Sequence, residues 1–226
     1  MPTRKTTSLT KKRVEQEQAF ERTRENMSEF GRAGTANRLL RSALKPILVK
    51  VADRYVSGRL TKRMMCIIQS DPVNGRGERI ITAQALSMLE GFNFNRNKSL
   101  NDTLYATYHI NYDRATGLAT IQIPFFNATA MVDAVAYTGS YGFIACALAI
   151  DFTHQQVEYA HQQTDIIAVN DTTTKSIHIS LSLPAGNVHP VIITLGVEFY
   201  DLDDDHKHVI IDKASNAMAV VKVLTG

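Results

Sequence analysis

The hydrophobic period of the chain changes near residue 104, and this change limits the possible folds more than any other feature. Over residues 15–70, apolar residues recur every three or four positions among good helix formers, which predicts amphipathic helices. After residue 104, apolar and polar residues alternate, which predicts half-buried strands. We therefore expect an α+β protein with a basic N-terminal arm (residues 1–14), a helical region (15–100) and an antiparallel β-sandwich (101–226). About eight strands of Greek-key or immunoglobulin-like type are expected in the sandwich.

One predicted strand, in the stretch YGFIACALAIDF (residues 141–152), is apolar on both faces. Its two alternating sets are Ile144, Cys146, Leu148 and Ile150 on one side, and Phe143, Ala145, Ala147 and Ala149 on the other. Such a strand has to be covered on its second side as well. Either the helical layer of the same chain or a neighbouring subunit can provide this cover.

Glycine and proline residues should interrupt the helical region. Gly31 and Gly34 weaken a helix or permit a close helix crossing, and Pro46 should start a new first turn. Ser57-Gly58 marks a further break, so residues 59–70 are expected to begin a separate helix.

A shorter helix is expected over residues 82–90. It is followed by Gly91, which suits a left-handed cap.

The small net charge of +3 hides a division of charge along the chain. Residues 1–100 carry 20 Lys and Arg against 9 Asp and Glu, a net charge of +11. Residues 101–226 carry 5 against 13, a net charge of −8. This division favours either an anionic partner for the first half, or copies of the protein that meet basic end to acidic end.

The stretch FERTRENMSEFGRAG (residues 20–34) interleaves arginines with glutamates. The acids stand at every fourth position, where Glu21 can pair with Arg24 and Glu29 with Arg32 across one turn. Interleaved acids repel phosphate, so the stretch favours a solvated or protein-facing amphipathic helix over a nucleic-acid binding site. The apolar stripe that we expect to pack inward consists of Phe20, Met27 and Phe30.

The N-terminal arm places basic residues on both sides of TTSLT (residues 6–10). Such an arm can neutralise the charge of a genome, as in many viral coats. Alternatively, the β-prone segment can add to the free edge of a sheet in another subunit. We favour an arm that docks on protein.

The stretch DLDDDHKHVIID (residues 201–212) imitates a calcium-binding loop, because carboxylates stand at its relative positions 1, 3, 5 and 12. His206 occupies the position where such a loop needs glycine. The stretch is therefore interpreted as a hairpin loop with solvated acids, and no metal site is predicted.

Common catalytic and targeting motifs are missing from the sequence. It contains no HExxH pair, no GxSxG elbow and no CxxC spacing, and Cys66 and Cys146 lie in apolar runs where cysteines are usually buried. No run approaches the roughly 18 apolar residues of a membrane span. We expect no enzymatic activity and no cofactor. Without a signal peptide, the expected location is cytoplasmic by default, or outside the cell as an assembled particle.

The run AFERTRENMSEFGRAGTANRLLRSALKPIL, followed by RLTKRM, RGER and MLEGF, resembles a group of uncharacterised bacterial proteins of the Bacteroidota type. The resemblance covers roughly residues 8–125, and its most specific part is the RTRENxxEFGRA motif that begins at residue 22. No activity is known for the group, so the resemblance implies no catalytic residues.

These observations lead to the hypothesis of a non-enzymatic structural protein that self-assembles into a filament, tube or shell. Its basic half would dock on the acidic half of the next copy. The expected interface residues are Arg4, Lys5, Lys11, Lys12, Arg13, Phe20, Met27 and Phe30 on one side, and Asp201, Asp203, Asp204 and Asp205 on the other. The alternative is a nucleic-acid-associated protein, such as a component of a virion or mobile element.

Overall fold

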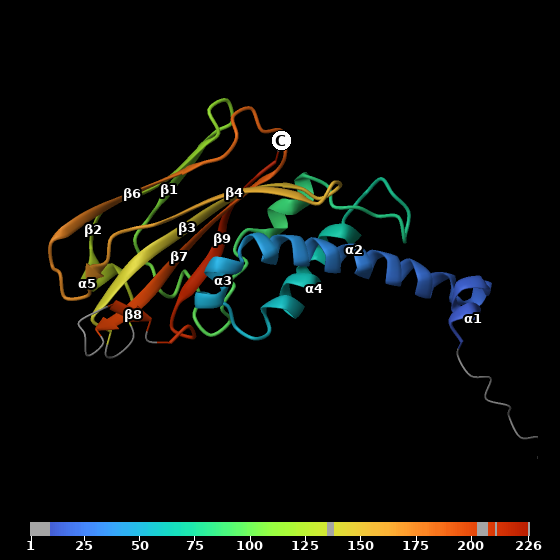
Figure 1. Ribbon diagram of the computed structural model, residues 1–226, viewed down its shortest axis with the longest axis horizontal. Helices are drawn as coiled ribbons and strands as arrows, with labels where there is room; N and C mark the ends of the chain where they lie inside the picture. Colours follow the sequence, from blue (N-terminus) through green and yellow to red (C-terminus); the bar gives the residue numbers. More distant parts are fainter. Residues whose placement is uncertain (1–9, 135–137, 203–207, 211, 226) are drawn as a thin grey trace, which may run out of the picture.

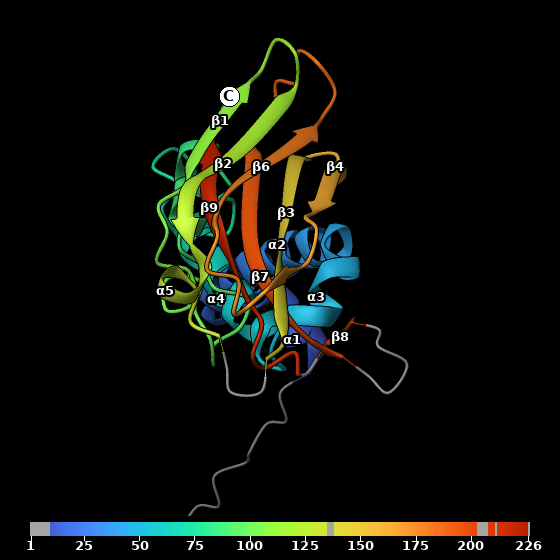
Figure 2. The same ribbon diagram turned by 90° about the vertical axis from the view of Figure 1, so that its left-hand side faces the viewer.

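The fold is built in three layers, which are a helical layer, a six-stranded sheet and a three-stranded sheet (Figures 1 and 2). The structure, a computed structural model, describes residues 10–134, 138–202, 208–210 and 212–225. Within these residues the main helices precede the strands in the chain, and the strand pairings are antiparallel. The predicted α+β class, with an N-terminal helical region and antiparallel sheets, is confirmed.

The helical layer has the predicted break at Pro46, whereas α2 (Glu21–Ala43) continues without a break through Gly31 and Gly34. The elements of this layer are α1 (Lys11–Gln16), η1 (Gln18–Phe20), α2 (Glu21–Ala43), α3 (Lys45–Val51), α4 (Val56–Gln69) and η2 (Gln84–Leu89). Pro46 lies in the first turn of α3, where its missing N–H is not needed. The break expected at Ser57-Gly58 is wrong, since both residues lie in the first turn of α4 and the chain leaves the helix at residues 52–55 instead.

The predicted helix over residues 82–90 forms as the 3₁₀ helix η2. Gly91 follows it with a φ of +77°, which confirms the left-handed cap.

Two sheets contain the strands. The smaller has the order β1-β2-β6, from β1 (His109–Asp113), β2 (Leu118–Asn127) and β6 (Thr174–Ser182). The larger has the path β4-β3-β7-β8, with β5 on β3 and β9 on β7. Its members are β3 (Ser140–Asp151), β4 (Gln156–Gln163), β5 (Ile167–Ala168), β7 (Val191–Leu202), β8 (His208–Ile210) and β9 (Ala217–Leu224). The short helix α5 (Ala128–Met131) follows β2.

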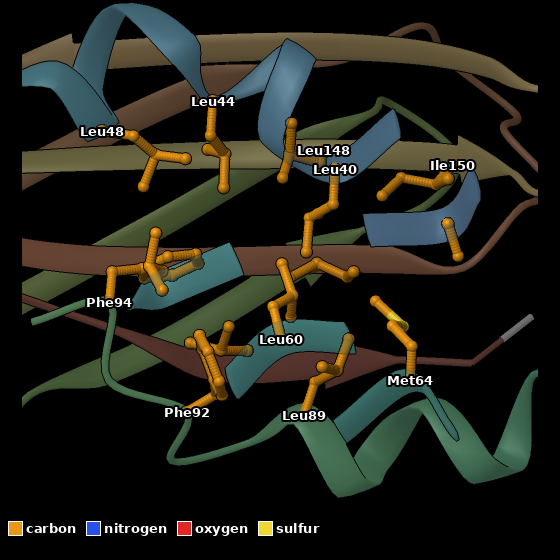
Figure 3. Packing of buried hydrophobic residues seen from close by; sticks show 14 of the residues in the cluster. Leu40, Leu44, Leu48, Leu60, Met64, Leu89, Phe92, Phe94, Leu148 and Ile150 are labelled. Carbon is orange, nitrogen blue, oxygen red and sulfur yellow. The ribbon is translucent and has the colours of Figure 1, made fainter. Parts of the chain in front are cut away.

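Strand β3 lies in the middle layer and contributes to two separate hydrophobic clusters. Ile144, Cys146, Leu148 and Ile150 pack with residues of the helical layer, including Leu40, Leu60 and Met64 (Figure 3). Phe143, Ala145, Ala147 and Ala149 pack with residues of the smaller sheet, such as Ile121 and Ile179. The cover on the second face of this strand is therefore the helical layer of the same chain.

The inward stripe predicted for α2 is wrong. The buried residues of this helix are Glu29, Ala33, Ala36, Asn37 and Leu40, whereas Met27 and Phe30 are 62% and 60% exposed. Phe20, in η1, is half-buried. Figure 1 shows that the first half of α2 extends beyond both sheets, so neither sheet covers it.

Two smaller expectations also fail. A Cβ atom built at Gly31 or Gly34 meets nothing within 4 Å, so neither glycine serves a close helix crossing. Cys146 is buried as predicted, but Cys66 is exposed, because its position on α4 faces away from the buried Met64, Ile67 and Ile68.

Candidate functional site

The predicted interface residues that the structure describes lie at opposite ends of the molecule. The described basic and apolar residues lie on α1, η1 and α2, and Figure 1 shows α1 far from the end of β7, where Asp201 is exposed beside β8. Within the described part of one chain, the basic and apolar residues are therefore not brought near Asp201. Five of the predicted residues lie outside the described part of the chain: Arg4, Lys5, Asp203, Asp204 and Asp205.

The cations of α1 are largely balanced within their own segment. Lys11 Nζ lies 3.8 Å from Glu15 Oε1, and the Arg13 guanidinium donates to the Glu17 carboxylate at 2.6 and 3.1 Å. The side-chain hydrogen bond from Arg13 also holds the pKa of Glu17 below its usual value. Of the three α1 cations predicted for the interface, Lys12 alone has no ion pair among the described residues.

Arg24 connects α2 to the segment that precedes it. Its Nη1 donates to the carbonyl oxygens of Val14 and Glu17, both at 2.8 Å, and so holds α1 against α2. The Arg13 guanidinium also lies 5.9 Å from the centroid of the Phe20 ring. Arg24 therefore caps backbone carbonyls and does not form the predicted pair with Glu21.

Glu29 and Arg32 bind α2 to the loop that follows α4. The carboxylate of Glu29, buried in α2, accepts from Gly77 N at 2.9 Å, and Arg32 Nη1 donates to Gly77 O at 2.6 Å and to Arg79 O at 3.1 Å. One helical turn earlier, Glu25 pairs with Arg76 at 3.5 Å. Most of the acid–base pattern around residues 20–34 is thus used inside the chain, which leaves few of these arginines for a nucleic acid.

Asp71 organises this loop from its own side. Its carboxylate accepts from Asn74 Nδ2 at 2.7 Å and from the backbone N–H groups of Ile80 and Val73, both at 2.9 Å. These bonds, with that of Asn74 Nδ2 the strongest, hold the pKa of Asp71 well below its ordinary value. The carboxylate therefore stays charged and keeps the loop in the shape that meets α2.

The exposed surface next to these contacts between α2 and the loop after α4 is apolar. Met27 and Phe30 of α2 and Met65 of α4 line a depression of about 380 Å³, together with Thr23 and Asn26. We call these five residues the apolar patch. Sequence spacing pointed to Met27 and Phe30, but it missed Met65, which belongs to a different helix. Large apolar side chains gathered on a projecting surface are typical of protein interaction sites.

A buried polar network lies at the other end of the helical layer. The Glu198 carboxylate of β7, fully buried, lies 3.5 Å from Lys50 Nζ and accepts from Gln163 Nε2 at 3.1 Å and from the Tyr200 hydroxyl. Burial, and then the hydrogen bond to Glu198, raise the pKa of Tyr200. The network joins α3, β4 and β7, and its contacts indicate a structural role.

Two findings concern metals and membranes. Among the described residues, no group of three His, Cys, Asp or Glu side chains is placed to hold a metal ion. In the same part of the chain, no helix is both long and apolar enough to cross a bilayer. Most of the acids of the calcium-like stretch, residues 203–205, lie outside the described ranges.

No protein-family model matches this sequence, and no curated protein matches it either.

Proposed function

We propose that the protein is a non-enzymatic structural protein that assembles with copies of itself into a filament, tube or shell. The observation that carries this proposal is the apolar patch, with Met27 and Phe30 more than half exposed on a part of α2 that projects from the body (Figure 1). The neighbouring copy would cover this patch with its acidic β-rich half. The β-rich half, which we take to be a sandwich of Greek-key type, would act as the rigid body of each unit.

The patch would act as an anchor within a larger interface. Full burial of a Met or Phe side chain contributes roughly 1.5–3 kcal/mol. A stable interface buries about 800 Å² per partner, so further contacts must surround these residues. The net charges of +11 and −8 on the two halves favour a contact of basic helical surface with acidic sheet surface and would speed the encounter.

The placement of the two predicted groups also supports a head-to-tail contact. Because the described basic and apolar residues and Asp201 lie at opposite ends of one molecule, a contact between them in two copies would leave both outer ends unused. Such a heterologous contact repeats into a polymer unless its rotation closes a ring.

Strand addition offers a second contact for the N-terminal arm. Strand β4 ends the path of the six-stranded sheet, and its sequence QVEYAHQQ contains none of the Lys or Pro residues that protect an edge. Its Glu158 is exposed and would suit the basic residues that flank TTSLT. By contrast, the doubly apolar β3 no longer argues for assembly, since its own chain covers both faces.

Mass measurement in solution tests the proposal. Sedimentation of the full chain from low to high micromolar concentration is expected to show concentration-dependent growth, weakened by salt. The double variant Met27→Lys, Phe30→Lys should weaken assembly by about a hundredfold, since two anchors of roughly 1.5 kcal/mol each would be lost. Val49→Lys, at a helical residue that is 70% exposed and outside the patch, is the matched control. The proposal is refuted if the wild-type chain is a monomer over this range and neither the double variant nor Val49→Lys changes its mass.

The second candidate function is association with a nucleic acid. It is favoured by the exposed Lys62 and Arg63 of α4, which have no ion pair among the described residues, and by the net charge of residues 1–100. Retention on DNA and RNA columns separates the two candidates, because phosphate contacts weaken steeply as salt rises. Retention that persists in the double patch variant and falls in Lys62→Gln, Arg63→Gln would favour this second function.

A further inference from the structure

Three loops that are far apart in the sequence meet around a pocket of about 630 Å³. They are the α3–α4 connection (residues 52–55), residues 95–97, and residues 212–214 before β9. We call the side chains of Arg54, Tyr55, Arg96 and Lys213, which line it, the arginine pocket. Its volume is within the range of roughly 300–1,000 Å³ that is typical of small-molecule sites.

Asp53 fixes the first two loops relative to each other. Its side chain is 5% exposed, and its carboxylate accepts from Tyr55 N at 2.6 Å and from Arg96 N at 2.8 Å. Arg59 neutralises the same carboxylate through a side-chain ion pair. The backbone positions of Arg54 and Arg96 are therefore set by a buried charge that is already balanced.

Asn95 fixes the third loop. This residue is 1% exposed, and its Nδ2 donates to the carbonyl oxygens of Lys213 at 3.2 Å, Ala214 at 2.9 Å and Asn216 at 2.8 Å. Its Oδ1 accepts from Asn97 N at 2.9 Å. Two buried polar side chains, Asp53 and Asn95, thus hold all three walls of the pocket in place.

The charged groups that face the pocket are mainly cations. The guanidinium carbons of Arg54 and Arg96 lie 4.6 and 5.3 Å from the centroid of the same Tyr55 ring. Arg54 also donates to the Tyr55 hydroxyl, whereas no hydrogen bond of the Arg96 side chain is found among the described residues. In the same part of the chain, neither arginine nor Lys213 has an ion pair, and the exposed acid that lines the pocket is Asp212.

An ordinary surface explanation accounts for part of this arrangement, because an arginine on a tyrosine ring is worth about 0.5–1 kcal/mol at an exposed site. It does not account for two guanidiniums on one ring in a pocket that a lysine also lines. Like charges gathered in this way repel each other unless an anion lies between them. The fork of N–H donors on each guanidinium matches the oxygens of a phosphate group.

We propose that the arginine pocket binds a small anion that carries phosphate groups. Arg54 and Arg96, oriented by Tyr55, would donate to its oxygens, and Lys213 would add a third positive charge. The volume leaves room for more than one phosphate group. A single-stranded nucleic acid fits less well, since such ligands stack their bases on aromatic rings and here both guanidiniums lie against the ring.

Calorimetric titration of the full chain with sodium pyrophosphate at low salt tests this inference. The expected result is saturable binding of one pyrophosphate per chain, with sulfate weaker by about tenfold or more. Arg96→Gln should weaken pyrophosphate binding by about tenfold or more, which corresponds to one charge-assisted contact. Arg96→Lys keeps the charge but loses the fork, and it should weaken binding by an intermediate factor. Arg63→Gln removes an exposed arginine outside the pocket and serves as the matched control.

Three outcomes would overturn the proposal. They are the absence of saturable binding, equal affinities for pyrophosphate and sulfate, and equal losses in Arg96→Gln and Arg63→Gln. A short single-stranded oligonucleotide titrated in parallel should bind more weakly than pyrophosphate, and tighter binding that depends on Arg96 would assign the pocket to nucleic acid instead. The result does not depend on self-assembly, because neither Arg96 nor Arg63 belongs to the apolar patch.

Discussion

Asp151, at the end of β3, should make the stability of the protein depend on pH in the acid range. Its carboxylate accepts from His154 N at 3.0 Å, from the His154 ring at 2.6 Å and from Thr153 N at 2.8 Å. These bonds, with that of the His154 backbone first, lower the pKa of Asp151 from 3.8 to about 2. A lowered folded-state pKa stabilises the fold above the unfolded value, and this contribution is lost as pH falls from about 4 to about 2.

The free energy of unfolding should therefore decrease over this range, and Asp151→Asn should make the decrease smaller. It should not abolish it, because Asp71 and Asp113 also have lowered pKa values. Urea unfolding at a series of pH values measures the slope. Glu158→Gln, at an exposed carboxylate of β4, is the control and should leave the slope as in the wild type. Equal slopes for Asp151→Asn and the wild type would contradict the prediction.

The contact between α2 and the loop of residues 71–80 depends on Gly77. Its φ is +81°, and a Cβ atom added there would lie 3.0 Å from Glu25 Cα, which is backbone and cannot rotate away. Gly77→Ala should therefore lower the free energy of unfolding by about 1–3 kcal/mol through backbone strain and the displaced helix contact. Gly75→Ala is the matched control, since a Cβ atom at Gly75 meets nothing within 4 Å. Denaturant unfolding should separate the two variants, and similar stabilities would show that the contact tolerates a shift.

Sequence periodicity predicted the helices and strands better than it predicted what packs against them. The change of period near residue 104 predicted the order of helices and strands, and the two apolar sets of β3 were assigned correctly to opposite faces. The stripe of Phe20, Met27 and Phe30 failed for a different reason. Periodicity tells which residues share one face of a helix, but the length of the neighbouring layers decides whether that face is covered.

Contacts between distant segments explain the rest of what the sequence could not predict. Glu29 was expected to pair with Arg32 within α2, but its ion-pair partner Arg79 comes from the loop after α4, as does Arg76, the partner of Glu25. The arginine pocket likewise combines three loops whose spacing in the chain carries no signal. Such sites arise from tertiary packing, which local spacing does not encode.

The three-layer arrangement of the whole molecule predicts that the β-rich half cannot stand alone. The face of the six-stranded sheet that meets the helices buries large apolar side chains, which include Leu148, Ile150, Ile192, Met218 and Val220. In a fragment of residues 101–226 these side chains would form a wide apolar surface in water, and surfaces of this kind aggregate. We expect the fragment to be insoluble, or to elute as large aggregates that bind a hydrophobic dye. Co-expression with residues 1–100 should restore a soluble complex, because that segment supplies the missing layer. A fragment that is a soluble monomer with a cooperative thermal transition would show that the helical layer is not needed to cover this face.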